Sequence, residues 1–108
     1  KRSIFFDFDS FVVKDDFRPV LEAHAKFLIA NPTRKIVLQG NTDERGSREY
    51  NIGLGERRAQ SVRRVLMLQG ASANQLTTVS YGEERPAATG SNEESWRLNR
   101  RVELVYAR

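Results

Sequence analysis

The sequence predicts an α/β (α+β) sandwich, in which a mixed four-stranded sheet carries two long helices on one face. Apolar residues alternate over 3–8 as in a half-buried strand, then recur at helical spacing over 17–31 and again over 47–69. The element order, β-α-β-α-β-β, favours a mixed sheet with both helices packed on one side. The 108 residues contain no cysteine and no internal repeat, so one domain spanning 1–108 is expected.

Each predicted element begins and ends at a recognisable signal. Asp15 and Asp16 suit the N-terminus of the first helix, and Pro32 ends it because proline disfavours a helical residue before it. Ser47 is expected to cap the long helix and Gly70 to end it. The expected strands are 3–8, 35–39, 75–81 and 101–106, with a turn at 40–46, a polar loop at 82–92 and a short helical turn at 93–98.

Charge and composition narrow the functional classes. The 18 basic and 14 acidic residues give a net charge of +4 and are interspersed, so an anionic partner is permitted but there is no basic arm. The arginines of the long helix point in different directions, and we expect no nucleic-acid binding. No apolar run approaches the roughly 18 residues of a membrane span. Lys1 stands almost directly before the first strand, which suggests a domain cut from a longer or processed precursor.

The most informative residues lie where the second strand leads into the long helix. The glycine-bounded turn 40–46 carries Asp43, and Arg58 falls on the apolar stripe of the helix beside Leu54, so its guanidinium should point inward. A buried guanidinium is costly unless it meets an acid or a bound anion. Asp43 and Arg58 could bridge each other and fasten the turn to the helix. They could instead hold the ammonium and the carboxylate of a small zwitterion, or bridge when empty and open around a ligand.

Six short segments match a known family in order across nearly the whole chain. They are 6–10 (FDFDS), 40–46 (GNTDERG), 50–51 (YN), 54–59 (LGERRA), 80–83 (SYGE) and 99–104 (NRRVEL). The chain resembles the OmpA-like peptidoglycan-binding domain, and within it the branch of the peptidoglycan-associated lipoproteins (Pal). The resemblance implies a non-catalytic module that binds the diaminopimelate-containing stem peptide of peptidoglycan, with no cofactor and no metal.

The family's binding residues can be carried over by position. The resemblance implies that Asp43 and Arg58 hold diaminopimelate. The secondary ligand contacts that it implies are Phe8, Asp9, Leu54, Asn99 and Arg101. The family often has histidine where this chain has Asn41, which can share a hydrogen bond but cannot take up a proton near neutral pH. No pH switch is therefore expected at this position.

The same resemblance implies a place in the cell. The domain would lie at the periplasmic face of the Gram-negative outer membrane, held there by a lipidated N-terminal tether that this sequence lacks. It would anchor the outer membrane to the cell wall and bind the propeller protein of the Tol system. The alternative is the same domain type in an outer-membrane barrel protein or a flagellar-motor stator. An enzyme or a nucleic-acid binder is the more distant possibility.

Other residues with chemical potential have plainer explanations. His24 lies on the apolar stripe of the first helix and is expected to pack as a structural residue. Trp96 is expected to pack, or to form part of a partner surface. The run 7–10 superficially looks like a calcium loop, but it lacks the turn glycine and the terminal glutamate of an EF-hand.

Overall fold

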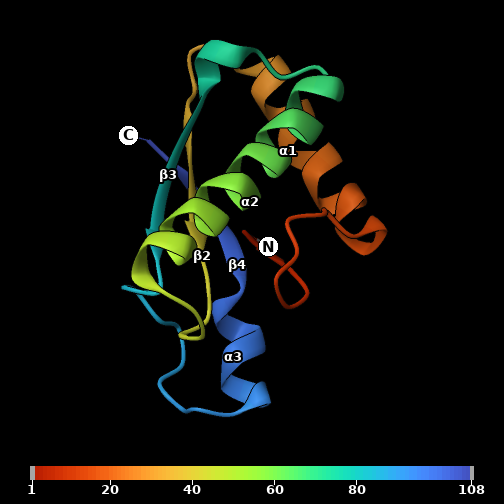
Figure 1. The fold of residues 1–108 in the computed structure, drawn as a ribbon. Helices are drawn as coiled ribbons and strands as arrows, with labels where there is room; N and C mark the ends of the chain where they lie inside the picture. Colours follow the sequence, from red (N-terminus) through yellow and green to blue (C-terminus); the bar gives the residue numbers. More distant parts are fainter. Residues whose placement is uncertain (1, 108) are drawn as a thin grey trace.

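The computed structural model describes residues 2–107 and shows a four-stranded sheet with α1 and α2 on one face (Figure 1). The strands are β1 (Ser3–Phe5), β2 (Ile36–Asn41), β3 (Leu76–Gly82) and β4 (Arg101–Tyr106). The helices are α1 (Arg18–Ala30), α2 (Arg48–Leu68) and the short α3 (Glu93–Asn99), with 3-10 turns η1 (Asp15–Phe17) and η2 (Ala73–Gln75). The predicted fold class is confirmed, and the expected element order agrees with it.

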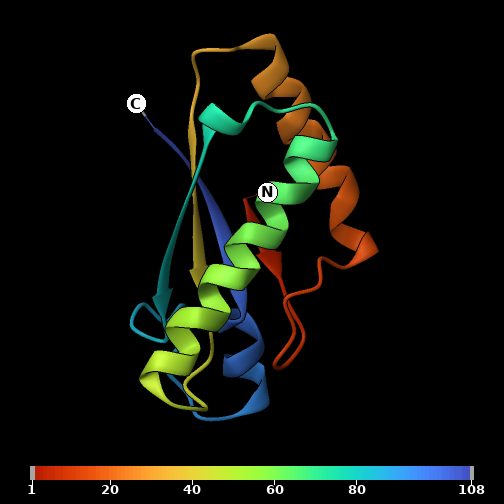
Figure 2. The ribbon, with the colours of Figure 1, turned by 45° about the horizontal axis from the view of Figure 1, so that its top comes forward.

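The strand order across the sheet is β1-β4-β2-β3. Strands β2 and β3 are parallel because α2 carries the chain back between them, whereas β4 runs antiparallel to β1 and β2. Figure 2 shows α1 and α2 covering the same face of this sheet. The carboxyl end of β2, the start of β4 and the start of α2 therefore meet at one end of the molecule.

A single apolar cluster fills the space between the sheet and the helices. Its members are fully or nearly fully buried and come from all four strands and both long helices, among them Ile4, Leu21, Leu28, Ile36, Leu38, Val62, Leu66, Leu76, Val102 and Leu104. On β2 the buried residues alternate, as expected for a strand with one covered face. This core fixes the position of α2 over β2, and so the position of the turn that joins them.

Two glycines bring α2 unusually close to β2. A β-carbon on Gly40 would overlap the backbone of Gly55, and one on Gly55 would overlap the Ser80 side chain. The sequence predicts Gly40 as the start of a turn, but β2 continues to Asn41. Gly40 lies inside the strand, at the point where the lack of a side chain lets strand and helix touch. Ser47 caps α2 as predicted, with its side chain accepting a hydrogen bond from the Tyr50 amide.

The first strand is shorter than the predicted range 3–8. It ends at Phe5, and Phe8 is 58% exposed instead of lying on a buried strand face. The backbone turns after Phe6, where the Ser10 amide donates to the Asp7 carbonyl and Asp9 adopts a φ of 54°. Alternation alone could not show this turn, which carries Phe8 and Asp9 out of the sheet and towards α2.

Candidate functional site

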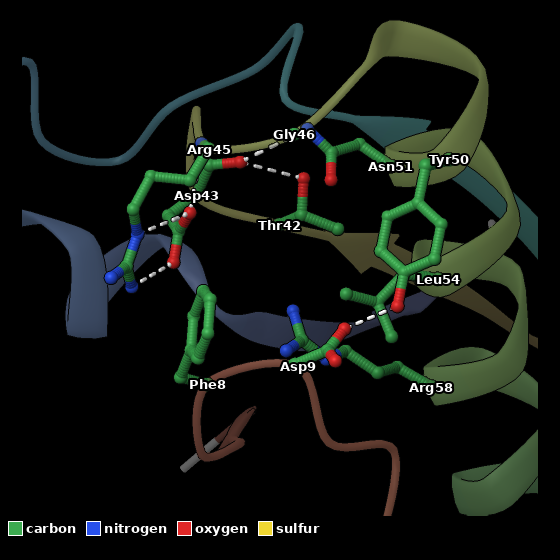
Figure 3. Close-up of a pocket in the computed structure, with 10 residues that line it drawn as sticks. All are labelled: Phe8, Asp9, Thr42, Asp43, Arg45, Gly46, Tyr50, Asn51, Leu54 and Arg58. Carbon is green, nitrogen blue, oxygen red and sulfur yellow. Dashed lines mark hydrogen bonds and ion pairs between the residues drawn. The ribbon is translucent and has the colours of Figure 1, made fainter.

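A pocket of about 200 Å³ opens at the end of the sheet where β2 leads into α2. Its lining comes from three segments: Phe8 and Asp9 of the loop after β1; Thr42, Asp43, Arg45 and Gly46 of the turn after β2; and Tyr50, Asn51, Leu54 and Arg58 of α2. Figure 3 shows the Asp43 carboxylate and the Arg58 guanidinium facing the same central space from different elements. Five of the seven residues that the resemblance implies as ligand contacts therefore line one hollow: Phe8, Asp9, Asp43, Leu54 and Arg58.

Asp43 is almost fully buried and is held by Arg45. Its Oδ1 accepts the Arg45 backbone amide at 3.0 Å, and its Oδ2 accepts the Arg45 Nη2 at 2.8 Å. Arg100 Nη1 lies 3.6 Å from the same Oδ2. Burial opposes ionisation of this carboxyl, but the hydrogen bonds from Arg45 outweigh it and hold the pKa of Asp43 below its usual value. Asp43 is therefore a carboxylate at neutral pH.

Arg58 is completely buried, and backbone carbonyls surround its guanidinium. Nε donates to the Ser10 carbonyl at 2.8 Å, Nη1 to the Asn41 carbonyl at 3.0 Å, and Nη2 to the Asp7 carbonyl at 3.1 Å. Burial lowers the pKa of Arg58 to about 10, so the side chain stays charged at neutral pH. The inward orientation predicted from the helical stripe is confirmed.

The direct Asp43–Arg58 bridge, one of the two sequence-based alternatives, is not formed. Within residues 2–107 no ion pair links these side chains. The Asp43 carboxylate interacts with Arg45 and Arg100 instead, and the Arg58 guanidinium donates to backbone carbonyl oxygens. Asp43 still favours the charged form of Arg58 through space. A buried cation paired only with neutral dipoles retains the capacity to attract an anion.

The rim of the pocket combines an acid with aromatic rings. The Tyr50 hydroxyl donates to the Asp9 carboxylate, and this bond raises the pKa of Tyr50. Leu54 is nearly buried and supplies an apolar wall, as expected. Phe8 lies half-exposed at the opening. The pocket can therefore contact the apolar stem of a ligand as well as its charged end.

Sequence reasoning missed two arginines. The Arg45 guanidinium lies between the rings of Phe8 and Trp96, 4.0 Å from each ring centre, so Trp96 helps to hold the cation that orients Asp43. Arg100 is buried, donates to the Phe6 carbonyl and pairs with Glu93 of α3. The position of Arg45, two residues after an aspartate in a turn, was a usable signal. For Arg100 the contacts with Phe6 and Asp43 had no such signal, because these residues are distant in sequence.

Asn99 and Arg101, two of the implied ligand contacts, do not line the pocket. The Asn99 side chain accepts from the amides of Ala87 and Ala88 and donates to the Ala88 carbonyl. Arg101 pairs with Glu103 and donates to the Arg85 carbonyl. Both side chains hold the loop between β3 and α3, which is a supporting position.

Within residues 2–107 no three His, Cys, Asp or Glu side chains gather in a way that could hold a metal ion. None of the helices described is both long enough and apolar enough to cross a membrane.

These features define an α+β domain with a two-charge pocket at one end of its sheet. The model of the OmpA family matches residues 5–100, and the chain belongs to this family. The chain is 59% identical over 102 residues to the peptidoglycan-associated lipoprotein of Pseudomonas putida, a match that covers 94% of this chain and 61% of that protein. Its identity to the protein of the same name from Pasteurella multocida is 48% over 104 residues, covering 96% and 69% of the two chains.

Solved structures agree with the sequence comparison. The crystal structure of the peptidoglycan-associated lipoprotein from Burkholderia pseudomallei matches with a TM-score of 0.98 at 51% identity, covering 99% of this chain and 91% of that one. The C-terminal domain of Helicobacter pylori MotB matches with a TM-score of 0.90 at 28% identity, covering 100% and 85%. The likeness is therefore greater to the lipoprotein than to this MotB domain.

Proposed function

We propose that this domain binds the diaminopimelate-containing stem peptide of peptidoglycan without catalysing a reaction. The observation that carries the proposal is the buried Arg58 guanidinium, which pairs with no carboxylate among residues 2–107 and shares a pocket with the Asp43 carboxylate. The names of the lipoprotein relatives support the choice of peptidoglycan.

The side-chain end of diaminopimelate carries one ammonium and one carboxylate. In the proposed complex the carboxylate faces Arg58, whose planar fork suits bidentate recognition. The ammonium faces Asp43, which shares its charge between the ligand and Arg45. Phe8 and Leu54 would contact the ligand's methylene groups.

Binding without catalysis is favoured by the side chains in the pocket. The Thr42 hydroxyl donates to the Asp43 backbone carbonyl, and no base among the lining residues accepts its proton. The histidine of this chain, His24, is hydrogen-bonded to Tyr106 and lies outside the pocket lining. The Tyr50 hydroxyl does donate to the Asp9 carboxylate, but this bond raises the pKa of Tyr50 and so disfavours the nucleophilic phenolate.

The cellular role that we propose is to anchor the outer membrane to the cell wall. A lipidated N-terminal tether would fix the domain at the periplasmic face of the membrane, and the propeller protein of the Tol system would be a second partner. The similarity to several peptidoglycan-associated lipoproteins supports this role. This chain spans 61% of the length of the Pseudomonas putida protein, so the tether belongs to the proposal. The MotB likeness keeps a motor stator as the second candidate.

A pull-down with purified peptidoglycan sacculi tests the binding function. The domain should sediment with sacculi, and free diaminopimelate should release it. Arg64→Ala is the matched control, because Arg64 is exposed on the same helix and outside the pocket lining. Sacculus binding that diaminopimelate does not reduce, or no binding at all, would contradict the proposal.

A further inference from the structure

A second hollow, of about 380 Å³, lies at the opposite end of the sheet from the Asp43 pocket. It is lined by Arg2, Ala23, His24, Phe27, Arg34 and Tyr106. A neighbouring hollow shares Arg2, Arg34 and Tyr106 and adds Lys35. Residues 34–35 precede β2 and the Asp43 turn follows it, so the two sites are separated by the length of that strand, about 20 Å.

Three cations converge on this surface, which we call the basic end (Arg2, Phe27, Arg34, Lys35 and Tyr106). The Arg2 guanidinium lies 5.0 Å and the Arg34 guanidinium 5.3 Å from the centre of the Tyr106 ring. Arg34 also lies 5.2 Å from the centre of the Phe27 ring. The two guanidinium groups thus contact one aromatic ring, and an anion placed near that ring would be attracted by both charges.

Among residues 2–107, the basic end has no acid paired with its cations. Within these residues no Asp or Glu lines either hollow, and no ion pair involves Arg2, Arg34 or Lys35. By contrast, Arg45 and Arg100 beside the Asp43 pocket are paired with carboxylates. The basic end is therefore an uncompensated positive surface built on aromatic rings.

Exposed apolar side chains accompany these cations at the same end of the molecule. Phe27 is 38% exposed and Ile29 is 52% exposed near the end of α1. Ile29 contacts the chain at Gly70, just after α2 ends. Figure 1 shows the ends of α1 and α2 and the start of β2 together, with α3 at the far end. Cations next to exposed aromatic and aliphatic groups are typical of surfaces that lie on a lipid headgroup layer.

We propose that the basic end binds the phosphate groups of an anionic phospholipid surface. A phosphodiester offers several oxygens to two guanidinium groups, and the flanking rings can lie at headgroup depth. The binding itself does not depend on the function proposed above. If that function holds, the wall pocket and the lipid surface occupy opposite ends of a domain whose longest extent is 41 Å, so both could be engaged together.

Vesicle sedimentation tests this proposal. The domain should bind vesicles containing 30% phosphatidylglycerol in phosphatidylethanolamine, bind phosphatidylcholine vesicles poorly, and lose binding as salt is raised. The double variant R34Q/K35Q should lower the partition coefficient about 25-fold, because each cation near an anionic membrane contributes roughly a fivefold factor. The matched control R57Q/R64Q removes the same charge from exposed positions on α2 and should change binding much less.

The outcomes separate the possible explanations. An equal loss with both double variants would mean that net charge alone attracts the domain, and would overturn the proposal. Equal binding to neutral vesicles, or saturable binding of inorganic phosphate without vesicle binding, would also overturn it. The variant R34Q/K35Q should keep full sacculus binding, so a failure of wall binding and a failure of lipid binding are measured separately.

Discussion

Replacing Arg58 with lysine keeps the charge at the base of the pocket but removes the planar fork. The three nitrogens of Arg58 donate to carbonyls of Asp7, Ser10 and Asn41. A hydrogen bond to a charged group contributes about 1.5 to 3 kcal/mol, and the single nitrogen of lysine is expected to keep one of the three. The loss of two such bonds predicts about 3 to 6 kcal/mol lower stability, a large part of the total for a small domain.

Urea unfolding followed by circular dichroism measures this loss. With a slope of about 1 to 3 kcal/mol per molar urea, the midpoint should fall by at least about 1 M while the slope stays the same. Sacculus binding should fall as well, even at temperatures where Arg58→Lys is folded, because the ligand carboxylate loses its bidentate partner. Arg64→Lys is the control, since Arg64 is exposed and should tolerate the change within about 0.5 kcal/mol.

An unchanged midpoint for Arg58→Lys would refute this reasoning about stability. It would mean that the carbonyls of the loop after β1 find other donors at little cost, so that Arg58 does not fasten that loop. Full sacculus binding by the folded variant would refute the proposed role of the guanidinium. The two measurements therefore test the structural and the ligand-binding role of one side chain independently.

Three further predictions concern the acid and the ligand. Asp43→Asn should raise the Kd for a diaminopimelate stem peptide at least about 30-fold in calorimetry, since a lost charge-assisted contact costs about 2 kcal/mol or more; an unchanged Kd would remove Asp43 from the site. The pKa of Asp43 is lower in the folded state, so the stability that its ionised form contributes is present above the unfolded value near 3.9 and disappears as pH falls through the folded value. Binding should accordingly be flat from pH 7 to 5 and decline only below about pH 4, and a decline near pH 6 would contradict this assignment. A lysine-type stem, which lacks the second carboxylate, should bind a hundredfold or more weaker than a diaminopimelate stem, and equal affinity would show that Arg58 serves the fold alone.

The features that the sequence could predict are those set by local spacing. The position of Arg58 on the helical stripe correctly predicted that its side chain points inward. The capping preference of Ser47 correctly predicted where α2 begins. The chain path after Phe6 was not predictable from alternation, because a turn held by Asp7 and Asp9 replaces the expected strand. Periodicity describes one element at a time and carries no information on where that element leaves the sheet.

The partners of the charged residues were the least predictable part of the site. Both the acid and the guanidinium were identified from the sequence, but the choice between a bridge and separate partners depends on the other groups that compete for each side chain. For Asp43 the competitors are Arg45 in its own turn and Arg100 from the end of α3. For Arg58 they are backbone carbonyls, which no residue pattern reveals. The identity of a side chain determines which groups it can pair with. The tertiary path of the backbone determines which of those groups lie within reach.

The carbonyl bonds of Arg58 also explain how the pocket can be ready for a ligand before one arrives. They join the loop after β1 to the end of β2 through a residue of α2, so the three segments that line the pocket are tied at one point. Arg45 fixes the Asp43 carboxylate from the other side. A zwitterion entering this space would meet both charges already oriented, and little ordering of side chains would oppose its binding. The same bonds make the fold depend on Arg58, so the side chain best placed to bind an anion is also one that the domain cannot easily lose.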